Sequence, residues 1–113
     1  MFILFTDFGS SDPYTGQVEA KLNNLAPNIP TIKLISNAPS FNPKPCAYLL
    51  SALEKEFYNG SIFLCIIDPG VGSKRFPLAI EADKKWFIGP DNGIISQIVK
   101  NAKEIKIKTI KMQ

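Results

Sequence analysis

The sequence predicts an α/β domain in which a mainly parallel sheet carries helices on both faces, a layered, Rossmann-like arrangement. Three observations favour it. Apolar strand segments alternate along the chain with segments of helical periodicity. The strongest strand segments are apolar without interruption, as strands buried on both faces are. Turns rich in glycine and proline separate these segments. The length of 113 residues suits one domain, and we expect a single domain over residues 1–113.

The first part of the chain predicts two strands joined by a helix. Residues 2–6 form a continuous apolar run, and residues 31–35 alternate as a strand does. Between them, Val18, Leu22 and Leu25 fall on one face of a helix. This order predicts a β-α-β unit with parallel strands.

The middle of the chain predicts a loop, a longer helix and the central strand. Residues 37–45 contain three prolines and are expected to form a loop. Apolar periodicity then predicts a helix over residues 46–57, which Asn59-Gly60 ends with residues that tolerate a left-handed cap. Residues 62–67 give the strongest strand pattern in the chain.

The last part predicts a hairpin, a short helix and a final strand. Residues 78–82 and 85–88 are expected to pair about a turn at Asp83-Lys84. A short helix is expected to open at Asn92-Gly93. Ile105, Ile107 and Ile110 predict the last strand.

Composition excludes several classes of protein. Hydrophobic residues make up 45% and charged residues 20%, which is typical of a globular chain. A net charge of +3 is too small to favour nucleic-acid binding, and no apolar run approaches the roughly 20 residues of a membrane span.

The N-terminus lacks the basic region of a signal peptide, and Cys46 and Cys65 are expected to be buried thiols in a reducing cytoplasm. Because the chain has no histidine, it contains neither a Ser-His-Asp triad nor a His-ligated metal.

Acidic residues follow three of the predicted strands. Asp7 and Asp68 each follow a predicted strand directly, and Asp91 follows the hairpin across Gly89-Pro90. Ligands of open α/β sheets bind beyond the carboxyl ends of the strands, so we expect Asp7 and Asp68 at one edge. Glycines lie near all three aspartates: Gly9, Gly70, Gly72, Gly89 and Gly93. Glycine allows close approach of a ligand to the backbone, although aspartate and glycine also simply form loops.

These carboxylates suit two kinds of chemistry. An ionised aspartate accepts two hydrogen bonds from a vicinal diol such as that of ribose, which suits Asp7 or Asp91. Asp68 and Arg75 are separated by a glycine-rich loop that can fold back to pair them. The arginine would then hold the carboxylate ionised and help to position a water or an anion. The alternative for Arg75 is a solvated surface charge beside Lys74.

Three aromatic residues offer rings on which a nucleobase can stack: Tyr14, Phe41 and Trp86. Most such residues instead belong to a core. Both interpretations remain open from the sequence.

Three motifs in order resemble a known enzyme family. They are Thr6-Asp7-Phe8-Gly9 with Asp12-x-Tyr14-x-Gly16, then Asp68-Pro69-Gly70-Val71-Gly72-Ser73-x-Arg75, then Gly89-Pro90-Asp91-Asn92-Gly93. The chain resembles the S-adenosyl-L-methionine (SAM) hydroxide adenosyltransferases, the adenosine-forming SAM hydrolases, which are related to SAM-dependent fluorinases and chlorinases. The resemblance covers the family's N-terminal domain only.

The resemblance implies a reaction and a set of site residues. Water or hydroxide attacks ribose C5′, and methionine leaves to give adenosine. The implied catalytic residues are Asp68 and Arg75, which hold the water. The implied substrate-binding residues are Asp7, Phe8, Phe41, Asp91 and Asn92, with Asp7 on the ribose hydroxyls. SAM is the substrate, and no cofactor or metal is implied. A carboxylate at Asp68 would repel halide and favours water over the halogenase chemistry.

Departures from the family pattern leave an alternative open. The family's catalytic histidine lies in a Ser/Thr-Phe-His-Gly-Arg-Asp stretch expected beyond Gln113, and another family histidine is replaced by Ser36. The family's C-terminal barrel-like domain, which covers the adenine of a neighbouring subunit in a trimer, also falls outside these residues. We therefore expect a cytoplasmic SAM hydrolase domain that forms a homotrimer if the C-terminal domain is supplied. The alternative is a catalytically incomplete nucleoside- or SAM-binding fragment that needs a partner chain.

Overall fold

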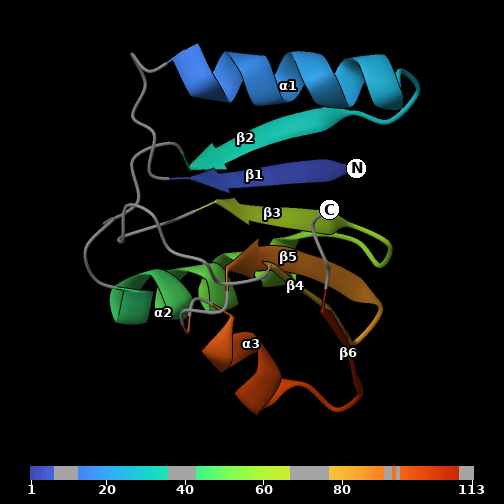
Figure 1. Cartoon of the computed structure of the whole chain (residues 1–113). Coiled ribbons are helices and arrows are strands. Elements are labelled where there is room, and N and C mark those ends of the chain that lie inside the picture. Colours follow the sequence, from blue (N-terminus) through green and yellow to red (C-terminus); the bar gives the residue numbers. More distant parts are fainter. Residues whose placement is uncertain (7–12, 36–42, 67–76, 91–92, 94, 110–113) are drawn as a thin grey trace.

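The computed structural model describes residues 1–6, 13–35, 43–66, 77–90, 93 and 95–109 (Figure 1). The strands are β1 (Phe2–Thr6), β2 (Thr31–Ile35), β3 (Ile62–Ile66), β4 (Pro77–Ala82), β5 (Lys85–Pro90) and β6 (Ile105–Thr109). The helices are α1 (Pro13–Leu25), α2 (Pro43–Leu53), the 3-10 helix η1 (Glu54–Glu56) and α3 (Ser96–Asn101). This order confirms the predicted α/β fold.

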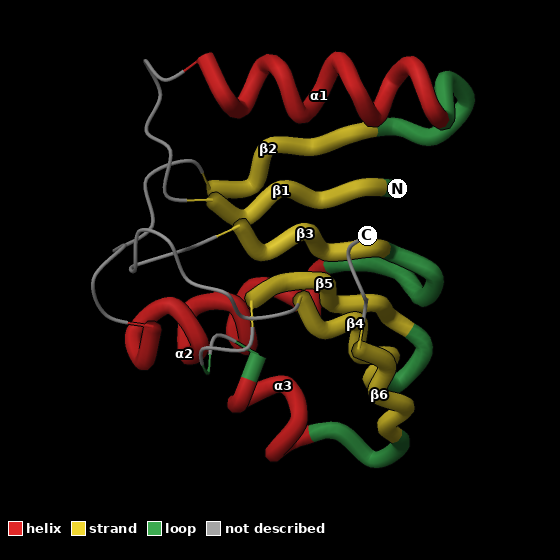
Figure 2. The backbone as a smooth tube through the Cα atoms, viewed as in Figure 1, coloured by secondary structure: helices red, strands yellow, loops and turns green. Residues whose placement is uncertain are grey.

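The described strands form one sheet in the order β2-β1-β3-β5-β4-β6 (Figure 2). β1 pairs in parallel with both β2 and β3, and β3 pairs in parallel with β5. β4 runs antiparallel to β5 and β6 and so is the reversed strand within this sheet. The chain leaves β1 toward β2 and then crosses back to β3 on the other side of β1. The strand order therefore reverses between β1 and β3, the position at which open α/β sheets bind ligands.

The core lies between one face of the sheet and helices α2 and α3. Helix side chains such as Cys46, Leu50 and Ile98 join a buried cluster with Phe5 and Phe63. The rings of Phe63 and Phe87 stack with centroids 4.9 Å apart and an interplanar angle of 11°. Burial of these large rings stabilises the packing of this face.

Helix α1 runs alongside β2 and contributes little to the core (Figure 1). Glu19 of α1 lies 3.5 Å from the ammonium group of Lys33 in β2. Val18 and Leu22 are half-buried, but Leu25 is 79% exposed. The predicted helix that carries these three residues is confirmed, and Leu25 in its last turn is left uncovered.

The predicted boundaries of the second helix need correction at both ends. α2 begins at Pro43, so the last part of the expected 37–45 loop is helical. Proline is tolerated in a first turn because its missing N–H group has no partner there in any case. α2 ends at Leu53 and passes into η1, and Phe57 then has extended backbone angles of φ −113° and ψ 150°. Gly60 has a φ of +89°, which agrees with the predicted left-handed position.

Both cysteines are buried thiols, as the sequence predicts. Burial raises the pKa of the Cys65 thiol well above its usual range, which keeps it protonated and unreactive. No helix within the described part of the chain is long and apolar enough to span a membrane.

Candidate functional site

Three parallel strands end side by side at one edge of the sheet. Thr6 at the end of β1 pairs with Ile66 at the end of β3. β3 and β5 pair through Leu64 and Ile88, and β5 continues to Pro90. The carboxyl ends of these strands therefore lie together, as parallel pairing requires. We call this side of the sheet the carboxyl edge.

Each of these strand ends leads directly into one of the three sequence motifs. The predicted site residues themselves lie outside the described residues: Asp7, Phe8, Phe41, Asp68, Arg75, Asp91 and Asn92. The structure thus describes the strands that lead into the motifs, and the roles of these side chains remain predictions. The prediction that strands one and three meet at one edge is confirmed by the β1-β3 pairing.

The segment that contains Asp68 and Arg75 has both of its ends at the carboxyl edge. It follows Ile66 in β3 and precedes Pro77 in β4, and Pro77 pairs with Pro90 at the end of β5. Because β5 separates β3 from β4, the two ends are two strand spacings apart, or roughly 10 Å. Asp68 and Arg75 each stand near one end of this segment in the sequence.

The backbone structure explains why the third motif has glycine at positions 89 and 93. A Cβ atom on Gly89 would lie 2.7 Å from the backbone oxygen of Cys65 and 3.1 Å from its Cβ. Gly89 is thus required by the close approach of β5 to β3, and the sequence prediction of ligand approach is not needed to explain it. Gly93 has a φ of +90°, a conformation that residues with side chains rarely adopt.

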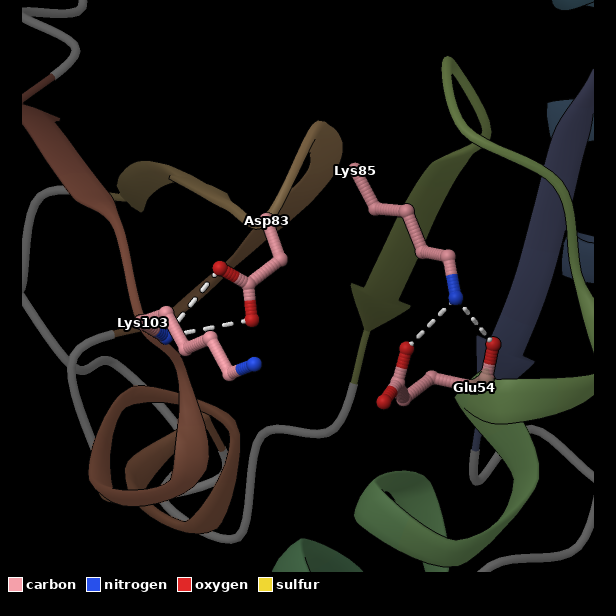
Figure 3. Close-up of polar contacts among 4 residues, drawn as sticks. All are labelled: Glu54, Asp83, Lys85 and Lys103. Carbon is pink, nitrogen blue, oxygen red and sulfur yellow. Dashed lines mark hydrogen bonds and ion pairs between the residues drawn. The ribbon is translucent and has the colours of Figure 1, made fainter.

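The opposite side of the sheet, which we call the amino edge, is held by polar contacts (Figure 3). The Lys85 ammonium group donates to both the carboxylate and the backbone oxygen of Glu54, each at 2.8 Å. Both side chains are largely buried, with 12% and 20% exposed. This pair ties the start of β5 to η1, far from the motifs.

Asp83 fixes the hairpin tip to the segment that precedes β6 (Figure 3). Asp83 and Lys84 have φ values of 49° and 70°, typical of a type I′ turn, which confirms the predicted hairpin. The Asp83 carboxylate accepts hydrogen bonds from the backbone N–H groups of Glu104 and Lys103, at 2.9 and 3.1 Å. These two N–H groups lower the pKa of Asp83.

A hollow of about 280 Å³ also opens at the amino edge. It is lined by Glu54, Asp83, Phe87 and Asn101, among others. Trp86 pairs with Ile62 near the start of both strands, which places it at the amino edge and away from the motifs. The ring of Trp86 is therefore not positioned to stack on a base at the carboxyl edge. No group of three or more histidine, cysteine, aspartate or glutamate side chains that could hold a metal occurs in the described ranges.

Comparison of the sequence with models of protein families identifies the family of this chain. Residues 2–113 match the model of the SAM hydroxide adenosyltransferase N-terminal domain. The chain belongs to this family. Its relatives include an (R)-S-adenosyl-L-methionine hydrolase of Thermus thermophilus, 35% identical over 80% of this chain and 35% of that protein. A second, of Methanocaldococcus jannaschii and with the same name, is 31% identical over 95% of this chain and 41% of that protein.

Two solved structures superpose on the fold of this chain. A conserved uncharacterised protein of Thermotoga maritima superposes with a TM-score of 0.91 at 24% identity, covering 98% of this chain and 43% of that chain. A conserved protein of Thermus thermophilus superposes with a TM-score of 0.80 at 28% identity, covering 94% of this chain and 45% of that chain. The chain thus spans less than half the length of these two solved chains and of the two hydrolases above.

Proposed function

We propose that this chain carries the SAM-binding and water-orienting part of an adenosine-forming SAM hydrolase site at its carboxyl edge. One observation supports this most strongly. β1, β3 and β5 end side by side, and each continues into one of the three motifs that resemble the family. Residues that are far apart in the sequence are thereby directed to one ligand-binding edge.

The proposed reaction needs alignment more than acid catalysis. The oxygen of water attacks ribose C5′ as the bond between C5′ and the sulfonium sulfur breaks. The electron pair of that bond passes to sulfur and gives neutral methionine, and the water loses a proton to give adenosine. Because the leaving group is already cationic, no acid is required to expel it. The site must instead orient and partly desolvate the water.

Asp68 and Arg75 are proposed to hold this water. The carboxylate of Asp68 would accept a hydrogen bond from the water, and Arg75 would keep that carboxylate ionised. The two anchored ends of their segment, roughly 10 Å apart across β5, support this pairing, since the segment must return to the same edge. A carboxylate there also disfavours halide as the nucleophile.

The remaining motif residues are proposed to bind the substrate. Asp7 would accept hydrogen bonds from the ribose hydroxyls, with Phe8 beside it. Phe41 is proposed as an aromatic contact to the ligand, and Asp91 with Asn92 as polar contacts from the third loop. No metal or cofactor is needed for this chemistry.

A second candidate function follows from the length of the relatives. This chain covers 35% and 41% of the two SAM hydrolases described above. We keep as the alternative a nucleoside-binding fragment whose site is completed by a partner chain. We also propose that the chain forms a homotrimer when the family's C-terminal domain is supplied.

Product analysis tests this proposal. The purified chain is incubated with SAM, with and without chloride, and the products are resolved by chromatography. The proposal predicts adenosine and methionine in amounts that do not depend on chloride, and loss of turnover in Asp68→Asn with adenosine affinity retained. Adenosine binding without turnover would favour the incomplete fragment. A chloride-dependent nucleoside product, or hydrolysis retained by Asp68→Asn, would contradict the assigned roles.

A further inference from the structure

Gly89 lies where β5 approaches β3 closely, near the carboxyl edge. The two strands pair through Leu64 and Ile88, and Gly89 follows Ile88 in the sequence. A Cβ atom on Gly89 would lie 2.7 Å from the backbone oxygen of Cys65. Real Cβ atoms essentially never come within 3.0 Å of another heavy atom, so only glycine fits at this position without a shift.

Space rather than backbone conformation accounts for the glycine at this position. The described glycines with a positive φ are Gly60 and Gly93, and an added Cβ on either would meet nothing within 4 Å. Gly89 shows the reverse, because its φ is not positive and its Cβ would meet the backbone of Cys65. Rotation of a side chain therefore cannot relieve this contact, and the two strands themselves would have to separate.

The displacement caused by a larger residue would fall on the end of β5. β3 is held by β1, with which it pairs as far as Ile66 and Thr6. Cys65 is fully buried in the core, so β3 has no free space into which it can move. Earlier in β5, the ring of Phe87 stacks on Phe63 and holds that part of the strand. The part of β5 that can move is therefore its end, which leads into the third motif.

We propose that Gly89 is a positioning residue for the site, because the close approach that it allows sets the distance between the second and third motifs. This inference rests on the proposed function. Cys65 lies three residues before Asp68, and Gly89 lies two residues before Asp91. Their contact therefore fixes the points from which both motifs leave the sheet. A misplacement on the order of 1 Å can cost roughly 10²-fold in a site that depends on alignment.

Adenosine binding tests the inference. Gly89→Ala is expected to weaken the affinity for adenosine at least about fivefold, because the third motif is moved away from the second. Phe87→Leu is the matched control, because it destabilises the same strand by loss of ring stacking but adds no atom between β5 and β3. This control is expected to lower the melting temperature and to leave the adenosine affinity unchanged. Isothermal titration calorimetry is carried out below the melting temperature of every variant, and circular dichroism verifies that each is folded.

A double-mutant cycle separates positioning from a general loss of stability. Asp91→Ala is expected to weaken adenosine binding several-fold in the wild type but to have little further effect when combined with Gly89→Ala. Asp7→Ala is expected to weaken binding by the same factor in both backgrounds, since β1 and the motif that follows it do not move. A merely structural effect of Gly89→Ala would not distinguish Asp91 from Asp7.

A titration of the ¹⁵N-labelled wild type with adenosine provides a second measurement that does not depend on the folding of Gly89→Ala. The amide signals of Cys65 and Gly89 are expected to shift, and constant signals at both would overturn the inference.

Three results with the variants would overturn the inference while leaving the proposed function intact. They are an unchanged affinity in Gly89→Ala, an equal loss in Phe87→Leu, and a full effect of Asp91→Ala in the Gly89→Ala background. Absence of saturable adenosine binding by the wild type would instead contradict the proposed function, and the inference with it.

Discussion

The amino edge of the sheet, where β3 and β5 begin, is a structural side of the molecule. The carboxyl edge, where these strands end, leads into the family motifs. At the amino edge, short connections are tied together by backbone and side-chain hydrogen bonds. Gly60 donates to Lys84, Asp83 to Glu104, and Trp86 to Ser61, at 2.7–3.0 Å. At the carboxyl edge, the same strands lead into the longer segments that carry the acidic motifs. Polar groups at the amino edge form hydrogen bonds with one another, whereas the aspartates of the carboxyl-edge motifs are proposed to bind a ligand.

This difference predicts that substitutions at the two edges have separate effects. Changes to the aspartates of the carboxyl-edge motifs should alter ligand binding with little effect on stability. Changes at the amino edge should alter stability with little effect on ligand binding. The predictions for Asp7, Glu54 and Asp83 each test one side of this division, and the prediction for Gly89 tests the packing of β5 against β3.

Asp7→Ala should have the largest effect on binding. We expect adenosine affinity to fall by about 1.5–3 kcal/mol, because a charged acceptor for the ribose hydroxyls is lost. The free energy of unfolding should change by less than about 0.5 kcal/mol, because this carboxylate is proposed to serve the ligand and not the fold. Isothermal titration calorimetry and urea unfolding measure the two quantities. An unchanged affinity would move ribose recognition to another residue.

Gly89→Ala should have the next largest effect, on stability. The new Cβ would lie 2.7 Å from the backbone oxygen of Cys65, so β5 and β3 would have to separate. We expect a loss of about 1–3 kcal/mol in the free energy of unfolding, the usual range for overpacking. Gly16→Ala in α1 is the control, since nothing lies within 4 Å of its added Cβ. That variant should be stabilised by about 0.5–1 kcal/mol, and equal behaviour of the two variants would refute the strand-packing explanation.

Glu54→Gln should weaken the amino edge alone. It removes the charge that faces the largely buried Lys85 ammonium group. We expect a loss of about 1–2 kcal/mol in the free energy of unfolding, with adenosine affinity unchanged. The exposed Glu56→Gln on the same turn is the control and should be neutral. Thermal unfolding of both variants at neutral pH distinguishes them, and an equal response would show that the buried ion pair does not contribute.

Asp83→Asn should have the smallest effect, which appears in how the stability of the fold changes with pH. The folded-state pKa of Asp83 is lowered from the usual 3.8, so its ionised form stabilises the fold above that pH. That contribution is lost as the pH falls below about 4 and through the folded-state pKa. The variant should therefore melt below the wild type at neutral pH, and the gap should close in acid. A gap that stays constant with pH would contradict a role for the ionised carboxylate.

Local patterns predict the strands better than the helix ends. The continuous run over residues 2–6 and the turn at Asp83-Lys84 are both confirmed, because buried strands and tight turns have strong local requirements. The end of α2 at Leu53 was not predicted, because Phe57 continues the apolar spacing yet packs edge-on against Phe63 from an extended backbone, with ring centroids 5.3 Å apart. Tertiary packing, which no local pattern contains, decides that boundary.

The sequence predicts where the candidate site should lie but not the distant contacts that hold the strands around it. Its proposed position at the carboxyl edge rests on the parallel pairing of β1 and β3, which acidic residues follow in the sequence. The need for glycine at Gly89 follows from a contact with Cys65, which is distant in the sequence and therefore invisible to spacing. The same holds for the ion pair of Glu54 and Lys85. Distant contacts of this kind require the fold itself.

A titration of the ¹⁵N-labelled chain with adenosine tests the central division most directly. The account predicts that backbone amide shifts change at the carboxyl edge, at Thr6 and Gly93, and stay constant at Asp83 and Trp86. Shifts centred on Asp83 and Trp86, with Thr6 and Gly93 unchanged, would place the ligand at the amino edge and contradict the account.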